Sequence, residues 1–143
     1  MSDFKGKKAI TFGVFDLLHY GHFELFRHIR DLVGDDGEVI VMLQKDEWVT
    51  KFKDVKLVYN FDQRKQMIET LRTVSKVLPY TQVDETIKTV DFDVAVFGPD
   101  QNHVGFQRAV AWTESQGKIV YRMSRTDGIS SSQLRSGTQK DVI

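Results

Sequence analysis

Short apolar segments alternate with segments of helical periodicity along most of the chain, and this alternation limits the fold more than any other feature. Short apolar runs bounded by Gly or polar residues predict buried strands, whereas apolar residues three and four apart predict amphipathic helices. Strands joined by helices form right-handed crossovers and a parallel sheet covered on both faces. We therefore expect an α/β fold, a Rossmann-like three-layer sandwich with a parallel five-stranded sheet.

The predicted elements follow one another without a linker or a repeat. Strands are expected at 9–12, 38–43, 76–79, 93–98 and 118–123. Helices are expected at 23–33, 61–72, 84–90 and 103–116, the second with Asn60 as N-cap and the last closed by Gly117, and a further helix is expected to begin near Ser130. Because ligands of such folds bind beyond the carboxyl ends of the strands, the site is expected in the loops that follow Gly13, Leu43, Gly98 and Met123.

Composition indicates one domain over residues 1–143. The chain is 41% hydrophobic, enough for a single core, and it has 20 basic and 20 acidic residues. A net charge of zero gives no general attraction to nucleic acid or to a membrane. The absence of Cys excludes a disulfide framework and a thiol nucleophile. No apolar run is long enough for a signal peptide or a membrane span, so we expect a cytoplasmic protein.

The junction between the first strand and the first helix carries the most chemistry. Asp16, His19, Gly21 and His22 lie close together there, and His22 falls in the first turn of the helix. Unpaired N–H groups and the helix dipole attract anions at such a point, and imidazoles can donate to a phosphoryl group. A single His at a helix start is usually a solvated or capping residue. A metal site is a second alternative, with a poor ligand set because no further His or Cys is near.

Two segments carry a family resemblance. The run TFGVFDLLHYGH at residues 11–22 resembles the HxGH signature of the cytidylyltransferase branch of nucleotidyltransferases, in particular the glycerol-3-phosphate cytidylyltransferase-like family. The run RTDGISSS at residues 125–132 resembles the RTxGISTT segment of the same family. The similarity extends from about Lys7 to Arg135, nearly the whole chain.

The resemblance implies that CMP passes from CTP to a phosphorylated alcohol, glycerol 3-phosphate in the first instance, with release of pyrophosphate. It implies a homodimer, and Mg²⁺ as the counterion of the nucleotide with Asp16 as a candidate ligand. It makes His19, His22, Lys53 and Arg125 the catalytic residues. The nucleotide-binding residues it implies are Thr11, Phe12, Asp16, Gly21, Arg64, Arg72, Asp100, Thr126, Ile129, Ser130 and Ser131.

Several of these assignments have alternatives. Asp16 either binds the metal or accepts backbone N–H bonds that shape the turn. Lys51 replaces Lys53 if the loop alignment has shifted by one residue. The serines after Ile129 are independently explained as a helix cap. Arg64 and Arg72 lie eight residues apart on one predicted helix, about two turns, and so share a face, although surface Arg residues are common on helices.

The acceptor is the least certain part of the interpretation. The family segment Gly-Asp-Asp-Trp-x-Gly-Lys is replaced here by GPDQNHVG at residues 98–105, which keeps Asp100 but loses the Trp and the Lys. A cytidylyltransferase for another polyol, aminoalcohol or sugar phosphate, an ATP-using adenylyltransferase, and a non-catalytic nucleotide-binding module therefore remain as alternatives.

Overall fold

Five parallel strands form the centre of the structure. The computed structural model describes residues 4–53 and 56–124, and of residues 52 and 53 only the backbone. The sheet order is β3-β2-β1-β4-β5, and the strands are β1 Lys8–Gly13, β2 Glu38–Gln44, β3 Lys76–Tyr80, β4 Val94–Phe97 and β5 Ile119–Arg122. All pairings are parallel. The fold class expected from the alternating pattern is confirmed.

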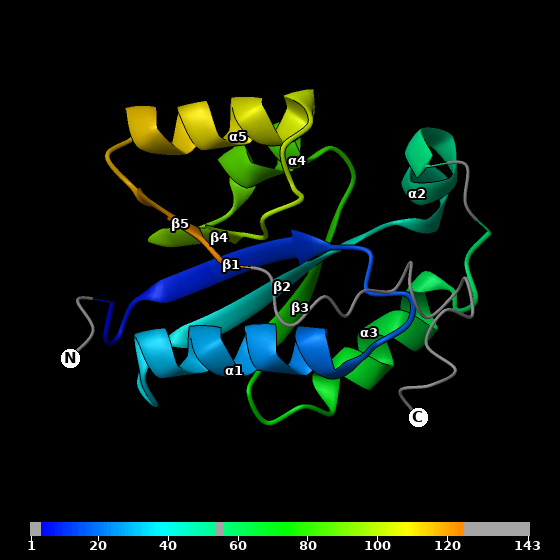
Figure 1. The fold of residues 1–143 in the computed structure, drawn as a ribbon, viewed down its shortest axis with the longest axis horizontal. Coiled ribbons are helices and arrows are strands. Elements are labelled where there is room, and N and C mark those ends of the chain that lie inside the picture. Colours follow the sequence, from blue (N-terminus) through cyan, green and yellow to red (C-terminus); the bar gives the residue numbers. More distant parts are fainter. Residues whose placement is uncertain (1–3, 54–55, 125–143) are drawn as a thin grey trace.

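Helices cover both faces of the sheet (Figure 1). On one side lie α1 Tyr20–Val33 and α3 Phe61–Glu69, and on the other lie α4 Val83–Thr86, which continues into the 3-10 turn η1 Ile87–Thr89, and α5 Val104–Ser115. The strands end on the side where α1 begins and where α2 Asp46–Lys53 lies. This edge therefore gathers the loops that were expected to form the site.

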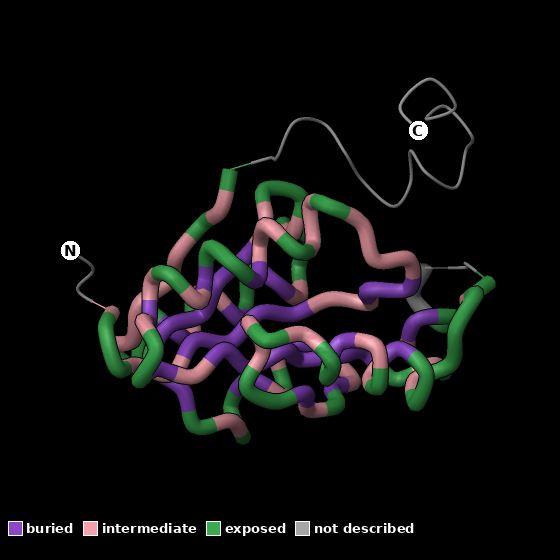
Figure 2. Tube along the Cα trace, turned by 90° about the horizontal axis from the view of Figure 1, so that it is seen from below, coloured by how far each residue is buried: buried purple, intermediate pink, exposed green. Residues whose placement is uncertain are grey.

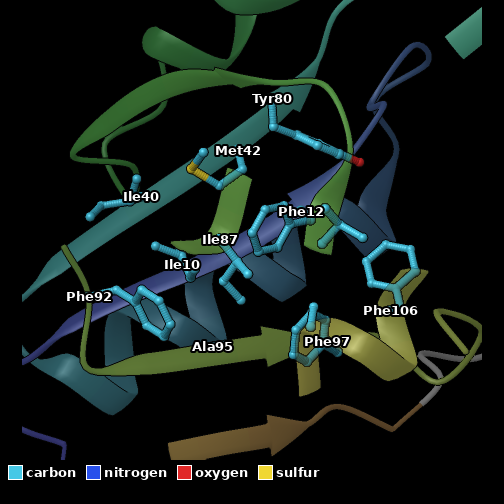
Figure 3. Close-up of a cluster of buried hydrophobic side chains, with 12 residues drawn as sticks. Ile10, Phe12, Ile40, Met42, Tyr80, Ile87, Phe92, Ala95, Phe97 and Phe106 are labelled. Carbon is cyan, nitrogen blue, oxygen red and sulfur yellow. The ribbon is translucent and has the colours of Figure 1, made fainter. Parts of the chain in front are cut away.

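The core has one layer on each face of the sheet. Toward α4 and α5, Phe12 and Phe97 stack and Tyr80 meets Phe12 edge to face, as Figure 3 shows. Toward α1 and α3, strand residues pack against Phe26 and Ile29 of α1 and Ile68 of α3. Burial is concentrated in the central strands (Figure 2). No helix in the described part of the chain is long and apolar enough to cross a bilayer.

Two helices differ from the predictions. The segment 46–53 is helical although no helix was predicted there. The apolar pattern is weak, since among the side chains of 46–51 only that of Val49 is buried. The helix predicted over 61–72 ends at Glu69, where the Thr70 hydroxyl and the Leu71 N–H bind the carbonyls of Met67 and Ile68. The helix expected near Ser130 lies outside the described residues.

Candidate active site

The loop after β1 begins with a close approach that only glycine allows. A Cβ atom on Gly13 would lie 2.6 Å from the ring of Phe15, which itself has a positive φ of 50°. The Phe15 ring is buried against Phe26 of α1 and meets the edge of the His22 ring. The loop is thus folded back on α1, and this fold brings His19 to the first turn of the helix.

His19 and His22 form a stacked pair at the start of α1. His19 is the N-cap, and its Nδ1 accepts the Gly21 N–H at 3.0 Å. The Nδ1 atom of His22 accepts the His19 N–H at 3.3 Å, which completes a reciprocal cap. The ring centroids are 3.8 Å apart and the planes are tilted by 20°. The capping alternative and the phosphate-site prediction are therefore compatible, because capping uses one nitrogen of each ring.

The remaining nitrogen of each ring carries the proton. Since Nδ1 accepts a hydrogen bond in both residues, the neutral imidazoles are Nε2–H tautomers. Burial lowers the pKa of His19, and burial together with the neighbouring His19 lowers the pKa of His22 to about 3. Both rings are thus neutral at physiological pH. The pair offers two N–H donors beside the N–H groups of the α1 N-terminus, which is an anion-binding arrangement.

Asp16 and Arg64 brace this loop. Asp16 is 3% exposed, and its two carboxylate oxygens accept the N–H groups of Val58 at 2.8 Å and Tyr59 at 2.9 Å. Arg64, which is fully buried, donates to the carbonyls of Val14 at 2.9 Å and Tyr59 at 3.2 Å. It also pairs with the carboxylate of Asp46 at the start of α2. We call Asp16, Asp46 and Arg64 the loop brace, because together they join the loop after β1 to α2 and to the loop before α3.

The loop brace bears on the roles expected for two residues. Arg64 was expected to contact the triphosphate, and its guanidinium is enclosed and bound to protein groups. Asp16 was considered as a metal ligand or as an acceptor of backbone N–H bonds that shape its turn, and it accepts the N–H groups of Val58 and Tyr59 in the loop before α3. Among residues 4–53 and 56–124, no three or more His, Asp or Glu residues gather closely enough to hold a metal ion.

Three further predicted nucleotide contacts are not supported by their positions. Thr11 is 1% exposed within β1, and the Phe12 ring lies in the core against Phe97. Arg72 is exposed but lies beyond the end of α3. The adjacent carbonyl of Thr73 accepts a bond from Arg30 in the last turn of α1, so Arg72 sits at the opposite edge of the sheet from His19. The reason is that a crossover helix runs antiparallel to the strands and ends at their amino-terminal edge.

The loop after β4 forms the other wall of the site. Asp100 is exposed in this loop, and His103 is the N-cap of α5, with its Nδ1 accepting the Gly105 N–H at 3.1 Å. The neighbouring strands β1 and β4 thus each lead to a helix that a His residue caps. Because α1 and α5 cover opposite faces of the sheet, the ends of β1 and β4 form a topological switch point. In α/β folds, ligands bind in the crevice at such a point.

A residue that sequence reasoning missed holds these two walls together. The side chain of Gln101 donates to the Phe12 carbonyl at 2.7 Å and accepts the Gly98 N–H at 2.9 Å. The only sequence signal for it was the loss of the family Trp next to the retained Asp100.

The other predicted site residues remain predictions. Arg125, Thr126, Ile129, Ser130 and Ser131 lie outside the described residues, and Lys53 is described by its backbone alone. Lys51 is exposed on α2, with its ammonium 4.7 Å from the centre of the Trp48 ring. Gly21 lies in the first turn of α1, where its N–H binds His19.

Comparisons with known proteins find one matching family and several named relatives. The model of the cytidylyltransferase-like family matches residues 10–137. The glycerol-3-phosphate cytidylyltransferase of Staphylococcus aureus is 36% identical over 132 residues, which cover 90% of this chain and 92% of that protein. The corresponding enzyme of Bacillus subtilis is 33% identical over 90% of this chain and 95% of its own length.

Two other relatives carry different names. A FAD synthase of Methanopyrus kandleri is 35% identical over 114 residues, which cover 78% of this chain and 75% of that protein. A crystal structure of a lipopolysaccharide core biosynthesis protein from Thermoplasma volcanium superposes with a TM-score of 0.69 at 25% identity, over 85% of this chain and 98% of that one.

Proposed function

Because the chain belongs to the cytidylyltransferase-like family of nucleotidyltransferases, we propose that it transfers CMP from CTP to a phosphorylated alcohol, with glycerol 3-phosphate as the first candidate. The products are CDP-glycerol and pyrophosphate. The observation that carries the proposal is the stacked pair of His19 and His22, whose Nε2–H groups stand at the N-terminus of α1. Two relatives named glycerol-3-phosphate cytidylyltransferase support the choice of substrates.

The acceptor supplies its own nucleophile. A phosphate oxygen of the acceptor attacks the α-phosphorus of CTP, the bond from that phosphorus to the bridging oxygen breaks, and pyrophosphate leaves with the electron pair. No covalent enzyme intermediate and no strong base are required, so catalysis consists of positioning and of stabilising charge. His19 and His22 donate from Nε2 to the oxygens of the α-phosphate region, where negative charge increases in the transition state. Neutral donors suffice, which agrees with the lowered pKa values of both rings.

The remaining charge comes from groups around the crevice. In this proposal Lys53 at the end of α2 and Arg125 after β5 bind the β- and γ-phosphates. The described residues offer no ready-made metal cluster, and Asp16 is a poor candidate ligand because it is 3% exposed and each of its carboxylate oxygens already accepts a backbone N–H. Mg²⁺ would therefore enter as the counterion of CTP and would offset charge on the triphosphate.

The loop after β4 is proposed to bind the acceptor. Asp100 and His103 are exposed there, across the switch-point crevice from the His19 loop. An acceptor bound by this loop would approach a nucleotide held at α1 from the opposite side of the crevice. That arrangement allows in-line attack.

A second candidate is synthesis of FAD, which one relative is named for. FAD contains an adenylyl group joined to a flavin phosphate, so the nucleotide would be ATP and the acceptor FMN. The chemistry at the α-phosphate is the same, because His19 and His22 read the phosphate and not the base.

A matrix of substrates tests both candidates. The purified protein is incubated with Mg²⁺, with CTP or ATP, and with glycerol 3-phosphate, FMN, or a polyol, aminoalcohol or sugar phosphate. Pyrophosphate release and product mass are then measured. CDP-glycerol as the main product is the expected result, whereas FAD as the main product would replace the proposal by the second candidate. Absence of pyrophosphate release with every pair would contradict both.

A further inference from the structure

The side-chain amide of Gln101 continues the hydrogen-bond ladder between β1 and β4 past the point where the strands separate. The paired residues of β1 and β4 run from Ala9 and Val94 to Thr11 and Val96. Beyond them β1 leads to α1 on one face of the sheet and β4 leads to α5 on the other (Figure 1). The Nε2 atom of Gln101 donates to Phe12 O at 2.7 Å, and its Oε1 accepts Gly98 N–H at 2.9 Å.

A primary amide suits this position because it has one donor and one acceptor face, like a peptide unit. The backbone groups of Phe12 and Gly98 lie where the two strands no longer reach each other, and backbone groups away from water need partners. Gln101 is half-buried, and its amide satisfies one group from each strand. The two strand ends are therefore held at a separation that the length of one amide sets.

The loop that carries Gln101 is itself held in place. The Gln101 N–H binds Gly98 O at 3.3 Å, which closes the loop into a turn. Arg122 at the end of β5 donates to Gln101 O at 3.0 Å, and its guanidinium lies over the Phe97 ring at 5.6 Å. The backbone of this loop is thus anchored to β4 and β5, and the side chain of Gln101 extends from it to β1.

We propose that Gln101 is a positioning residue for nucleotidyl transfer, which sets the width of the crevice between the His19 loop and the loop of Asp100 and His103. This inference rests on the proposed function, because it takes these loops as the two substrate-binding walls. Gln101 acts through Phe12 and Gly98 and binds no substrate itself. In-line transfer depends steeply on the placement of the two reacting groups, so a small change in this width affects turnover more than it affects nucleotide affinity.

The two hydrogen bonds from the Gln101 side chain to Phe12 and Gly98 are called the bridge. The variant Gln101→Glu tests this bridge with almost no change in side-chain shape. The carboxylate still accepts the Gly98 N–H but cannot donate to the Phe12 carbonyl, and the two oxygens repel. We expect kcat to fall about 10- to 100-fold while the dissociation constant of CTP changes by less than about threefold. Turnover is measured with whichever nucleotide and acceptor the wild type uses fastest, so a different acceptor leaves the comparison intact.

Gln44→Glu is the matched control. The Gln44 amide donates to the Thr81 carbonyl at 2.9 Å at the ends of β2 and β3, so this variant loses the same kind of bond away from the β1–β4 crevice. Unfolding in urea is measured for both variants. An equal fall of kcat in both would mean that the loss reflects general destabilisation, and it would overturn the proposal. A weakened CTP affinity with unchanged kcat in Gln101→Glu would overturn it as well.

A lower pH should restore part of the turnover that Gln101→Glu loses. When the introduced carboxyl is protonated it can donate to Phe12 O, so the kcat ratio of variant to wild type should rise as the pH falls from about 8 to about 5.5. A ratio that does not change with pH would contradict the bridge.

Hydrogen exchange of the amides at residues 98–103 gives a readout that needs no turnover. It should become faster in Gln101→Glu and stay unchanged in Gln44→Glu. Unchanged exchange in both variants would overturn the bridge whatever the substrates are, whereas a wild type without turnover would contradict only the proposed function.

Discussion

At the scale of single residues, the site depends on which nitrogen of each imidazole is engaged. His19 and His22 use Nδ1 to accept backbone N–H groups, so their protons lie on Nε2. The same bonds cap α1 and orient both rings. One pair of residues therefore has a structural role, with a small effect on stability, and a proposed chemical role, with a large effect on turnover.

Removing either imidazole should separate these roles. We expect His19→Ala and His22→Ala each to lower kcat by about two orders of magnitude or more, because a donor to transition-state charge is lost. The loss of a helix cap should lower the unfolding free energy by only about 1 kcal/mol. Steady-state kinetics and urea unfolding measure the two effects. His28→Ala on the same helix is the control, because His28 contacts Tyr121 outside the crevice; rates within about threefold of wild type for both site variants would contradict the assignment.

The lowered pKa of His22 predicts how stability depends on pH. The folded protein keeps this ring neutral to a pKa of about 3, whereas the unfolded chain protonates it near its ordinary value. Below about pH 6.5 the unfolded state binds more protons, so folding stability falls as the pH falls. We expect the unfolding free energy of His22→Gln to fall by about 2 kcal/mol less than that of wild type between about pH 7.5 and about pH 5. Urea titrations at several pH values measure this difference, and parallel curves for the two proteins would contradict the buried, neutral His22.

At the scale of elements, the loops are held by buried polar contacts between segments distant in sequence. The loop brace joins the loop after β1, the first residue of α2 and the loop before α3. Gln101 and Arg122 hold the loop after β4 in the same way. The loops of the site are thus held by the sheet and by one another, in addition to the contacts within each loop.

Removal of the Arg64 side chain should lower the stability of the fold more than it lowers the affinity for CTP. Arg64→Met leaves the Val14 carbonyl and the Asp46 carboxylate without their partner, and we expect the unfolding free energy to fall by about 2 kcal/mol. Arg72→Met at the opposite edge should leave both stability and CTP affinity near wild type. Urea unfolding and calorimetry with CTP measure these effects. An Arg64→Met protein of unchanged stability that has lost CTP affinity would restore Arg64 as a nucleotide ligand.

The loop after β4 should control the acceptor. We expect Asp100→Ala and His103→Ala to raise the acceptor KM or lower its kcat/KM by about tenfold, since hydrogen-bonded groups discriminate strongly between substrates. CTP affinity, measured by calorimetry, should stay nearly unchanged. Weakened CTP binding with an unchanged acceptor KM would move both residues to the nucleotide site.

At the scale of the whole molecule, the formal net charge is zero, so any affinity for polyanions must come from the local site. The sheet also has two edge strands, β3 and β5, among the described residues. Near-zero net charge weakens repulsion between copies of the chain, and a strand without a neighbour on one side among the described residues can pair with a partner.

We therefore predict a homodimer. Light scattering at micromolar concentration should give twice the chain mass of 16.5 kDa. Activity per chain should fall on dilution if the partner supports the site. A monomer mass with full activity would contradict the prediction.

Local patterns determined the strands, most helix positions and the pair of His residues at the start of α1, because periodicity, caps and turn residues act within a few positions of the chain. The resemblance of the segments 11–22 and 125–132 to known motifs identified the family, which the comparisons confirm. The local patterns did not determine the partners of polar side chains. Arg64 is buried in the loop brace, Arg72 lies at the far edge, and Gln101 bridges β1 and β4. These outcomes depend on which distant segments the sheet brings together, so only the tertiary structure decides whether a charged or polar group faces a substrate or holds the loops that do.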